Sequence, residues 1–383
     1  MEELHAEVGL AQLSKVGEEL CGDKIELVRT PDSTIVVLSD GLGSGVKANI
    51  LATLTTKIAS SMLQRRIPLD EVLATIAETL PVCRQRKIAY STFQILQIDA
   101  SGLATIVEFD CPQAFVIRGG KVVSFPTHEK SIAGKLTHIG QLLLQEDDIV
   151  VCVSDGVIHA GIGGLLKLGW NWQGIARYLE SEYEAGWDAD VVVRRVINCC
   201  EGYYLSRPGD DSSVVAVRLR RPRYLTLLTG PPAEPAHDEA VVKRFLSQPG
   251  VKIVAGGTTA NIVSRLIRQP LHVDLSYYDP EIPPTGRLKG IDLVTEGVLT
   301  LNAAVDRIQH SQRLHNPTYQ DGATLLARQL LHADKIFIFA GTAVNPAHQN
   351  PNFPLGINLK AQVLDKLKQA LAERGKQIEI EWL

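Results

Sequence analysis

The first part of the chain is patterned as short β-strands with two helices among them. Runs rich in β-branched and aromatic residues, such as Thr34–Leu38, predict strands. Ile98–Gly102 and Arg118–Lys121 each place turn residues between two such runs, which predicts tight antiparallel hairpins. Apolar residues recur at helical spacing at about 45–65 and 69–86. An antiparallel sheet with helices segregated in sequence predicts a layered α+β domain up to about residue 219.

The second part of the chain alternates strands with helices. Each expected strand is followed by a turn that contains glycine and, in most cases, by a helical pattern, which predicts βα units and a mainly parallel sheet. The expected strands are Tyr224–Leu228, Val251–Ala255, Ile291–Thr295 and Lys335–Ala340, with a closing helix at about 359–374 and a strand at Gln377–Trp382. The polar segment Arg220–Arg223 lies between the two patterns, so we expect two domains, at 1–220 and 221–383.

Composition narrows the class of protein. The 383 residues are 45% hydrophobic and 21% charged, with a net charge of -4, which is typical of globular domains and lacks the basic excess of a nucleic-acid binder. No apolar run reaches the ~18 residues of a membrane span, and the start MEELHAEVGL lacks the basic residues of a signal peptide. The six cysteines form no C-x-x-C pair. We therefore expect a cytoplasmic protein that binds neither nucleic acid nor membrane, and a homodimer remains open.

Aspartates stand beside glycine where strands of the first domain begin or end. Asp40 and Asp155 each follow an apolar run and precede a glycine. Asp210 and Asp211 precede the last strand of the domain, and Asp23 precedes another strand. Desolvating an unpaired carboxylate costs several kcal/mol, so we expect a cation to accompany these residues.

The cation expected beside these aspartates is either an arginine or a metal ion. Hard oxygen ligands next to small glycines suit Mg²⁺ or Mn²⁺, and the absence of histidine and cysteine from the motifs argues against zinc. As isolated dipeptides, Asp-Gly pairs are ordinary turn formers, but two Ser-Asp-Gly copies and one Gly-Asp-Asp make that interpretation less favourable. A dinucleotide-binding turn after Asp40 is disfavoured, because its third glycine would fall on Val46.

Four separated motifs resemble those of the metal-dependent protein phosphatases of the 2C type. They are Gly22-Asp23, Ser39–Gly45 with Ala48 beyond, Ser154–Val157, and Gly209–Val215. The similarity is to the bacterial branch represented by the phosphatase domain of stage II sporulation protein E, and it covers about residues 5–219. This resemblance implies a four-layer αββα sandwich with two Mn²⁺ or Mg²⁺ ions at one end.

The resemblance also implies roles for the motif residues. Asp40 would bridge both ions, the carbonyl of Gly41 would bind one of them, and Asp155 and Asp210 would bind the other. A hydroxide that bridges the ions would then attack phosphorus, with no covalent intermediate on the enzyme.

Other positions have less definite parts in the resemblance. Asp23 would act through a coordinated water or the second ion, and Asp211 occupies a place where many relatives have asparagine. The phosphate-gripping arginine of the eukaryotic branch has no firm counterpart; Arg29 and Lys15 are positional candidates. His159 is better explained as a helix-face residue than as a leaving-group acid.

The function implied is that of a Mn²⁺- or Mg²⁺-dependent serine/threonine protein phosphatase. Its substrate would be a phosphorylated signalling protein of the anti-sigma-factor antagonist type, and the C-terminal domain would regulate it. In this branch the helices after Gly45, at 46–57 and 69–80, are expected to shift and complete the metal site. The alternative is a ligand-binding regulator with an inactive phosphatase-like domain, which the presence of all four ligand aspartates disfavours.

The second domain has small and hydroxyl residues where its strands end. Carboxyl ends of parallel strands share one edge, where helix N-termini attract an anion or a small polar ligand. Candidate ligand-binding residues are Gly256, Gly257, Thr258, Thr259, Thr295, Glu296, Gly341 and Thr342. Plain turn and capping chemistry explains the same residues equally well, and the segment lacks the lysine of a P-loop.

Overall fold

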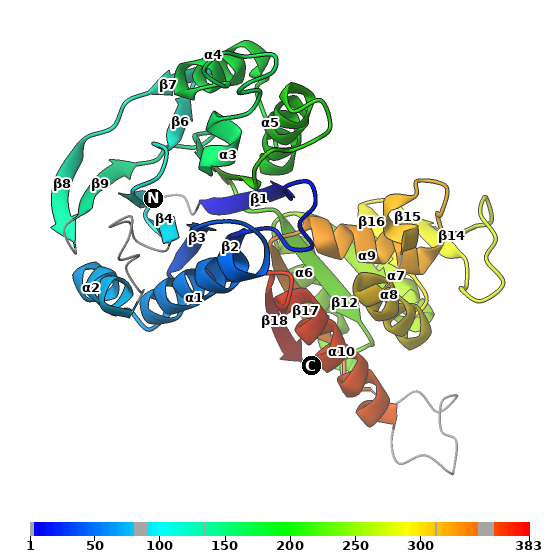
Figure 1. Cartoon of the computed structure of the whole chain (residues 1–383). Coiled ribbons are helices and arrows are strands. Elements are labelled where there is room, and N and C mark those ends of the chain that lie inside the picture. The colour runs from blue at the N-terminus through cyan, green and yellow to red at the C-terminus, as the bar shows by residue number, and fades with distance from the viewer. Residues whose placement is uncertain (1–3, 80–90, 133–134, 311, 344–355) are drawn as a thin grey trace. The chain divides into compact units, whose positions relative to one another are not determined.

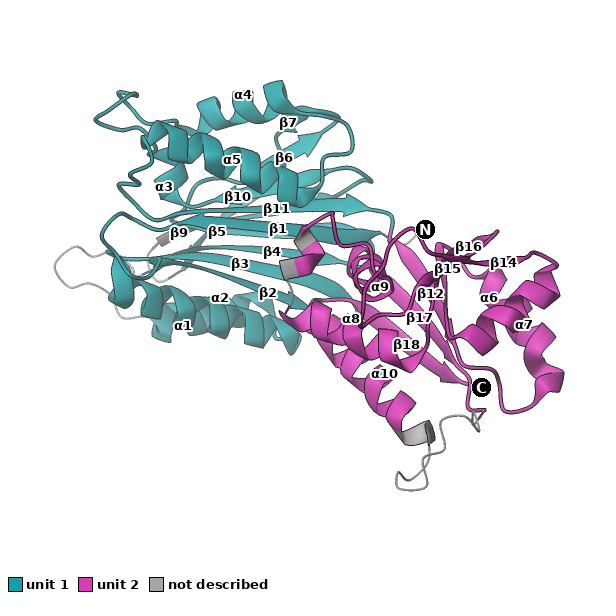
Figure 2. Ribbon diagram, turned by 90° about the vertical axis from the view of Figure 1, so that its right-hand side faces the viewer, with its two compact units in different colours: residues 1–221 teal, residues 222–383 magenta. Residues whose placement is uncertain are grey.

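The computed structural model describes residues 4–79, 91–132, 135–310, 312–343 and 356–383. The chain divides into two units, Met1–Arg221 and Pro222–Leu383 (Figure 1; Figure 2, teal and magenta). None of the helices in these ranges is both long and apolar enough to cross a membrane.

The first unit contains two sheets in which all paired strands are antiparallel. One has the order β2 (Asp23–Arg29), β3 (Ser33–Gly41), β4 (Ser91–Asp99), β5 (Leu103–Phe109), β9 (Lys135–Leu143) and β8 (Thr127–Ile132). The other has the order β1 (His5–Leu13), β11 (Ser212–Arg220), β10 (Ile149–Val153), β6 (Phe115–Arg118) and β7 (Lys121–Val123). The hairpins β4–β5 and β6–β7 confirm the two turns that the sequence predicts.

Helices pack on the outer face of each sheet in the first unit (Figure 2). The six-stranded sheet contacts α1 (Gly45–Gln64) and α2 (Leu69–Thr79), and the five-stranded sheet packs against α3 (Asp155–Ile158), α4 (Trp172–Glu182) and α5 (Ala189–Tyr203). Strand β3 shows why: Ile35 packs toward α1 and α2, whereas Val36 packs toward the other sheet. Period-2 alternation thus buries both faces of the strand. The part of the predicted 69–86 helix beyond residue 79 lies outside the described residues.

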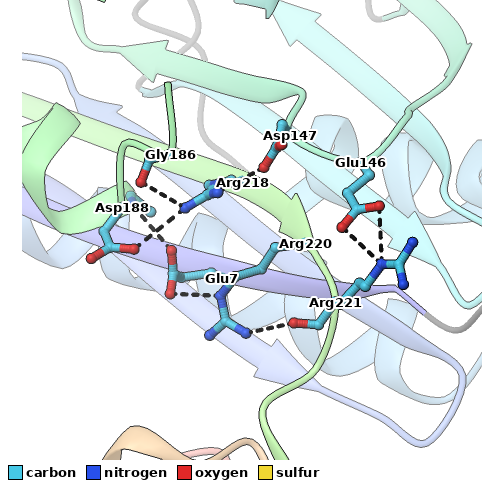
Figure 3. Close-up of polar contacts among 9 residues, drawn as sticks. Glu7, Glu146, Asp147, Gly186, Asp188, Arg218, Arg220 and Arg221 are labelled. Atoms are coloured by element: carbon cyan, nitrogen blue, oxygen red, sulfur yellow. Dashed lines mark hydrogen bonds and ion pairs between the residues drawn. The ribbon is translucent and has the colours of Figure 1, made fainter. Parts of the chain in front are cut away.

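Ion pairs hold the end of β11 to the rest of the first unit (Figure 3). Arg218 pairs with Asp147 at 2.7 Å, and Arg220 pairs with Glu7 at 2.8 Å. Arg221 donates from Nε to Glu146 at 3.0 Å. The end of β11, and Arg221 directly after it, are therefore anchored to the rest of the first unit.

The second unit is built on one seven-stranded sheet. Its order is β14 (Leu271–Asp274), β15 (Thr285–Leu288), β16 (Ile291–Thr295), β13 (Val251–Ala255), β12 (Tyr224–Thr229), β17 (Lys335–Ala340) and β18 (Gln377–Trp382). The pairs from β16 to β18 are parallel, and β14 and β15 join as an antiparallel hairpin that the sequence patterns did not indicate.

The helices of the second unit cover both faces of its sheet. One face packs against α6 (Asp238–Ser247) and α7 (Gly257–Ile267). The other packs against α8 (Val298–His310), α9 (Gly322–His332) and α10 (Gly356–Ala372). Strands β13 and β16 extend the sheet on one side of β12, and β17 and β18 extend it on the other. The winding direction therefore reverses between β12 and β17.

Candidate active site

Asp23 and Asp40 are direct neighbours on adjacent strands. Asp23 begins β2, Asp40 lies at the end of β3, and the two are register partners in the antiparallel pair. The side chain of Asp23 is buried, and Asp40 is partly buried. One strand pair of the six-stranded sheet thus presents two carboxylates together.

The five-stranded sheet supplies the other aspartates. Asp155 opens α3 directly after β10, and Asp210 and Asp211 directly precede β11, which pairs with β10. Ser213 fixes this end of the pair, because its backbone N–H donates to Ser154 Oγ at 2.8 Å and its carbonyl accepts from Ser154 N–H at 3.0 Å.

A buried hydrogen bond links the two groups of aspartates. The hydroxyl of Ser213 donates to Asp23 Oδ2 at 2.7 Å, and Gln12 Nε2 donates to the same hydroxyl at 2.8 Å. The Gly-Asp-Asp-Ser-Ser motif contains Ser213, so its proximity to the aspartates was a usable signal. Gln12 lies in β1, where nothing in the sequence distinguished it.

The electrostatics show that the aspartates converge. Burial raises the pKa of Asp40 to about 9, with repulsion from Asp23 and Asp155 as the next causes. Burial also raises the pKa of Asp23 to about 6, although hydrogen bonds from Ser213 and Ser154 oppose the shift. The pKa of Asp210 is raised by burial and then by Asp155. Carboxylates from both sheets therefore destabilise one another's charged forms.

Glycines allow the segments that carry these aspartates to pack closely. A β-carbon on Gly41 would stand 2.0 Å from the carbonyl oxygen of Ala48 in α1. A β-carbon on Gly156 would stand 2.0 Å from the carbonyl oxygen of Asp211, and one on Gly22 would stand 2.8 Å from Asp211 Oδ2. Any larger residue at Gly41 or Gly156 would force the backbone segments apart.

Tyr204 is a further residue of the site that sequence patterns did not reveal. Its hydroxyl donates to the carbonyl oxygen of Gly156 at 2.7 Å, immediately after Asp155. Burial raises the pKa of the Tyr204 phenol, so the hydroxyl keeps its proton and remains a donor. Tyr204 therefore holds the first turn of α3 in place.

The two positional candidates for a phosphate-binding cation lie in different places. Arg29 is at the opposite end of β2 from Asp23 and donates to the carbonyl of Ala6 at 2.8 Å. Lys15 lies beside the aspartates. Its backbone N–H donates to Asp211 Oδ1 at 3.0 Å, and its charge partly opposes the rise in the pKa of Asp210. Only Lys15 is therefore positioned near the site.

The donor set is suited to a hard divalent cation. Asp23 Oδ1 and Asp211 Oδ2 are buried carboxylate oxygens without a hydrogen-bond partner, and within the described ranges no lysine or arginine forms an ion pair with either residue. Buried anionic oxygens without partners fit an oxygen-ligated ion. In the part of the chain that the structure describes, however, no three His, Cys, Asp or Glu side chains are arranged to hold a metal ion as they stand.

The candidate residues of the second unit lie along the carboxyl edge of its parallel strands. The N–H of Gly256 donates to the carbonyl of Thr295 at 2.9 Å, and Thr258 and Thr259 follow in the first turn of α7. Gly341 follows β17, and its N–H donates to the carbonyl of Thr229 at 2.9 Å. All the candidate residues lie at or just beyond the carboxyl ends of β13, β16 and β17: Gly256, Gly257, Thr258, Thr259, Thr295, Glu296, Gly341 and Thr342.

The α+β fold of the first unit and its aspartate cluster define a phosphatase domain of the 2C-like class. Residues 30–220 match the family model described as stage II sporulation protein E (SpoIIE), and this part of the chain belongs to that family. Nothing among the curated proteins matched the chain.

Three solved structures of low sequence identity are similar to this chain, and the first of them shares the fold of the first unit. The phosphatase domain of SpoIIE from Bacillus subtilis with a fragment of its regulatory domain is 19% identical, with a TM-score of 0.50, over 57% of this chain and 63% of that chain. Another crystal form of the SpoIIE phosphatase domain is 18% identical, with a TM-score of 0.46, over 58% and 95%. The RsbU and RsbW domains of a Mycobacterium tuberculosis protein are 16% identical, with a TM-score of 0.47, over 63% and 68%.

Proposed function

We propose that the first unit is a Mg²⁺- or Mn²⁺-dependent phosphatase that hydrolyses phosphoserine or phosphothreonine on a partner signalling protein. The observation that carries this proposal is the gathering of Asp23, Asp40, Asp155 and Asp210 from two sheets, where burial and neighbouring carboxylates raise the pKa values of Asp23, Asp40 and Asp210. Membership of residues 30–220 in the SpoIIE family supports it. The proposal includes the four-layer αββα sandwich expected from the sequence, which the outer helices on both sheets support.

In this proposal the aspartates hold two ions. Asp40 would help to hold both ions, the carbonyl of Gly41 would hold one of them, and Asp155 and Asp210 would hold the other. Asp23 would support them, with Asp211 as an accessory. When bound, such ions activate water and neutralise the charge of the phosphate. Because the carboxylates are not yet arranged as a ligand set, we expect movement of α1 and α2 to accompany binding.

The chain's own residues prepare the site for this chemistry. Ser213 orients Asp23, Tyr204 fixes the turn after Asp155, and both act by donating a hydrogen bond. Lys15 supplies a positive charge that acts on Asp210, and we propose that it attracts the phosphoryl group of the substrate. Water would then attack phosphorus, and the serine or threonine oxygen would leave, beside Asp40.

In this proposal the second unit regulates the phosphatase by binding a small ligand. The substrate is a phosphorylated protein of the anti-sigma-factor antagonist type, and both proteins act in the cytoplasm. The alternative, a ligand-binding regulator with an inactive first unit, is less favourable because the chain retains all four aspartates that the resemblance implies as ligands: Asp23, Asp40, Asp155 and Asp210.

A metal titration tests the proposal. Hydrolysis of p-nitrophenyl phosphate and of a phosphothreonine peptide would be measured against Mn²⁺ and Mg²⁺ concentration for the full chain and for Asp40→Ala. We expect turnover that needs the metal and Asp40. Absence of any such turnover, with metal binding intact, would favour the inactive regulator. Deleting residues 222–383 should change the activity of the first unit, and unchanged activity would remove the regulatory role.

A further inference from the structure

The second unit contains a cavity and, separately, a site around Lys360. The two differ in whether their charged side chains form ion pairs. The cavity, of about 290 Å³, is lined by residues of the 274–287 and 320–325 segments. Its charged groups are already paired: Arg287 with Asp274 at 2.8 Å, and Asp321 in a buried ion pair with Arg307. A charged ligand there would have to break an existing pair, so the lysine site is the better candidate.

The lysine site lies where the winding of the sheet reverses. Strands β12 and β17 are parallel neighbours, and their carboxyl ends lead into Gly230 and Gly341. Doubly wound sheets bind ligands at this kind of reversal, because the loops on the two sides diverge to opposite faces. The helix after β12 packs on one face and the helix after β17 packs on the other.

The two loops meet closely at this point because both contain glycine. Gly230 has a φ of +76°, which other residues rarely adopt. A β-carbon on Gly341 would stand only 1.9 Å from the carbonyl oxygen of Pro231. Both glycines are therefore required by the backbone, and neither brings a side chain to the junction.

Lys360 of α10 brings a positive charge to the junction. Its Nζ donates to the carbonyl oxygen of Gly341 at 2.7 Å and stands 2.3 Å from where a β-carbon of Gly230 would be. Within the described residues no carboxylate lies within ion-pair distance of this ammonium, and burial lowers the pKa of Lys360 with no acidic neighbour to oppose the shift. An ammonium has three N–H donors, and the carbonyl of Gly341 uses one.

We propose that Lys360, at the junction of β12 and β17, binds the anionic group, a phosphate or a carboxylate, of a small ligand of the second unit. The neighbouring N-terminus of α7 is less suited, because Glu296 Oε1 lies 4.0 Å from where a β-carbon of Gly257 would stand. A carboxylate at that helix end repels an anion, whereas Lys360 attracts one. This site gives the regulatory role a chemical basis and does not depend on phosphatase activity.

Protection from chemical modification tests the site in the intact chain. Acetylation of Lys360 by acetic anhydride would be followed by peptide mass spectrometry in EDTA, with added inorganic phosphate, acetate or chloride at equal ionic strength. EDTA keeps metal ions off the aspartates of the first unit, so that the added anion does not bind there through a metal ion. We expect phosphate or acetate, and not chloride, to slow modification of Lys360, while the exposed Lys368 of the same helix reacts at an unchanged rate. The anion that protects identifies the ligand class.

Substitution provides the second arm. Calorimetric titration of the protecting anion into Lys360→Met should show at least about tenfold weaker binding, with Lys360→Arg intermediate and Lys368→Met unchanged. Equal modification rates in all three salts would overturn the proposal, as would equal affinity in Lys360→Met and wild type. If Lys360→Met fails to fold, the protection experiment on wild type decides alone. Loss of phosphatase activity in any variant would bear on the proposed function and not on this site.

Discussion

Ser213 donates a 2.7 Å hydrogen bond to the buried carboxylate of Asp23, which lies 190 positions earlier in the chain. The bond joins the start of β11 in one sheet to the start of β2 in the other. It leaves Asp23 Oδ1 without a partner, so one oxygen is held and the other is available to a cation. Asp23 is thus oriented before any ion binds.

Removing this bond should weaken metal binding more than it slows catalysis. In Ser213→Ala, Asp23 loses its fixed orientation, and we expect about tenfold weaker activation by Mn²⁺, because residues that orient ligands contribute on that scale. Activity at saturating Mn²⁺ should return close to the wild-type value. Ser181→Ala is a matched control, since that hydroxyl bonds only to its own helix. Equal activation constants in Ser213→Ala and wild type would contradict the assignment.

Asp40→Asn should abolish activity and stabilise the metal-free protein. The amide cannot carry the negative charge that an ion needs, so turnover should fall on the order of 10²-fold or more. The same change removes the cost of protonating Asp40 on folding, a cost that arises because burial and the charges of Asp23 and Asp155 disfavour the ionised carboxylate. The free energy of unfolding without metal should therefore rise at pH 8. Chemical denaturation in EDTA and phosphatase assays measure the two effects. Asp32→Asn, an exposed carboxylate, should change neither.

The stability of the metal-free protein should fall as pH rises. The folded-state pKa of Asp40 is raised to about 9, above the ordinary value of about 4 in the unfolded chain, so the folded state holds its proton longer. The favourable contribution is complete at low pH and is lost between about pH 4 and pH 9. Thermal unfolding in EDTA across this range should show the loss, and Asp40→Asn should reduce its slope. An identical slope in the variant would contradict the prediction.

Metal binding should release protons for the same reason. An ion bound at Asp40 favours the ionised carboxylate, so the proton held below about pH 9 must leave. Calorimetry of Mg²⁺ binding in two buffers of different ionisation enthalpy counts the protons. We expect the number to decrease as pH approaches 9. A pH-independent count would show that Asp40 is already ionised.

Tyr204→Phe should loosen the turn after Asp155. The variant loses the 2.7 Å hydrogen bond to the carbonyl of Gly156, at a cost of about 1 kcal/mol in stability. Because Asp155 is the adjacent residue, activation by Mn²⁺ should also weaken. Tyr203→Phe is the control, since the ring of Tyr203 packs on Trp170 and its hydroxyl does not reach this turn. Equal metal activation in both variants would reduce Tyr204 to a purely structural role.

The candidate carboxylates of the site could be named from the sequence alone. Asp40 and Asp155 each follow an apolar run and precede a glycine, and such local features are legible because strand alternation and turn chemistry depend on neighbours in the chain. The strands around them, including the hairpins after Asp99 and Arg118, lie where the patterns predict.

Which residues lie close together could be known only from the fold. Gln12 contacts Ser213, 201 positions away, and Tyr204 contacts Gly156, 48 positions away, and no local signal marks either residue. Lys360 reaches Gly230 only because β17 pairs with β12 and α10 packs back on that face. Strand order results from burial summed over the whole core, so residues distant in sequence become neighbours without any mark in their own segments.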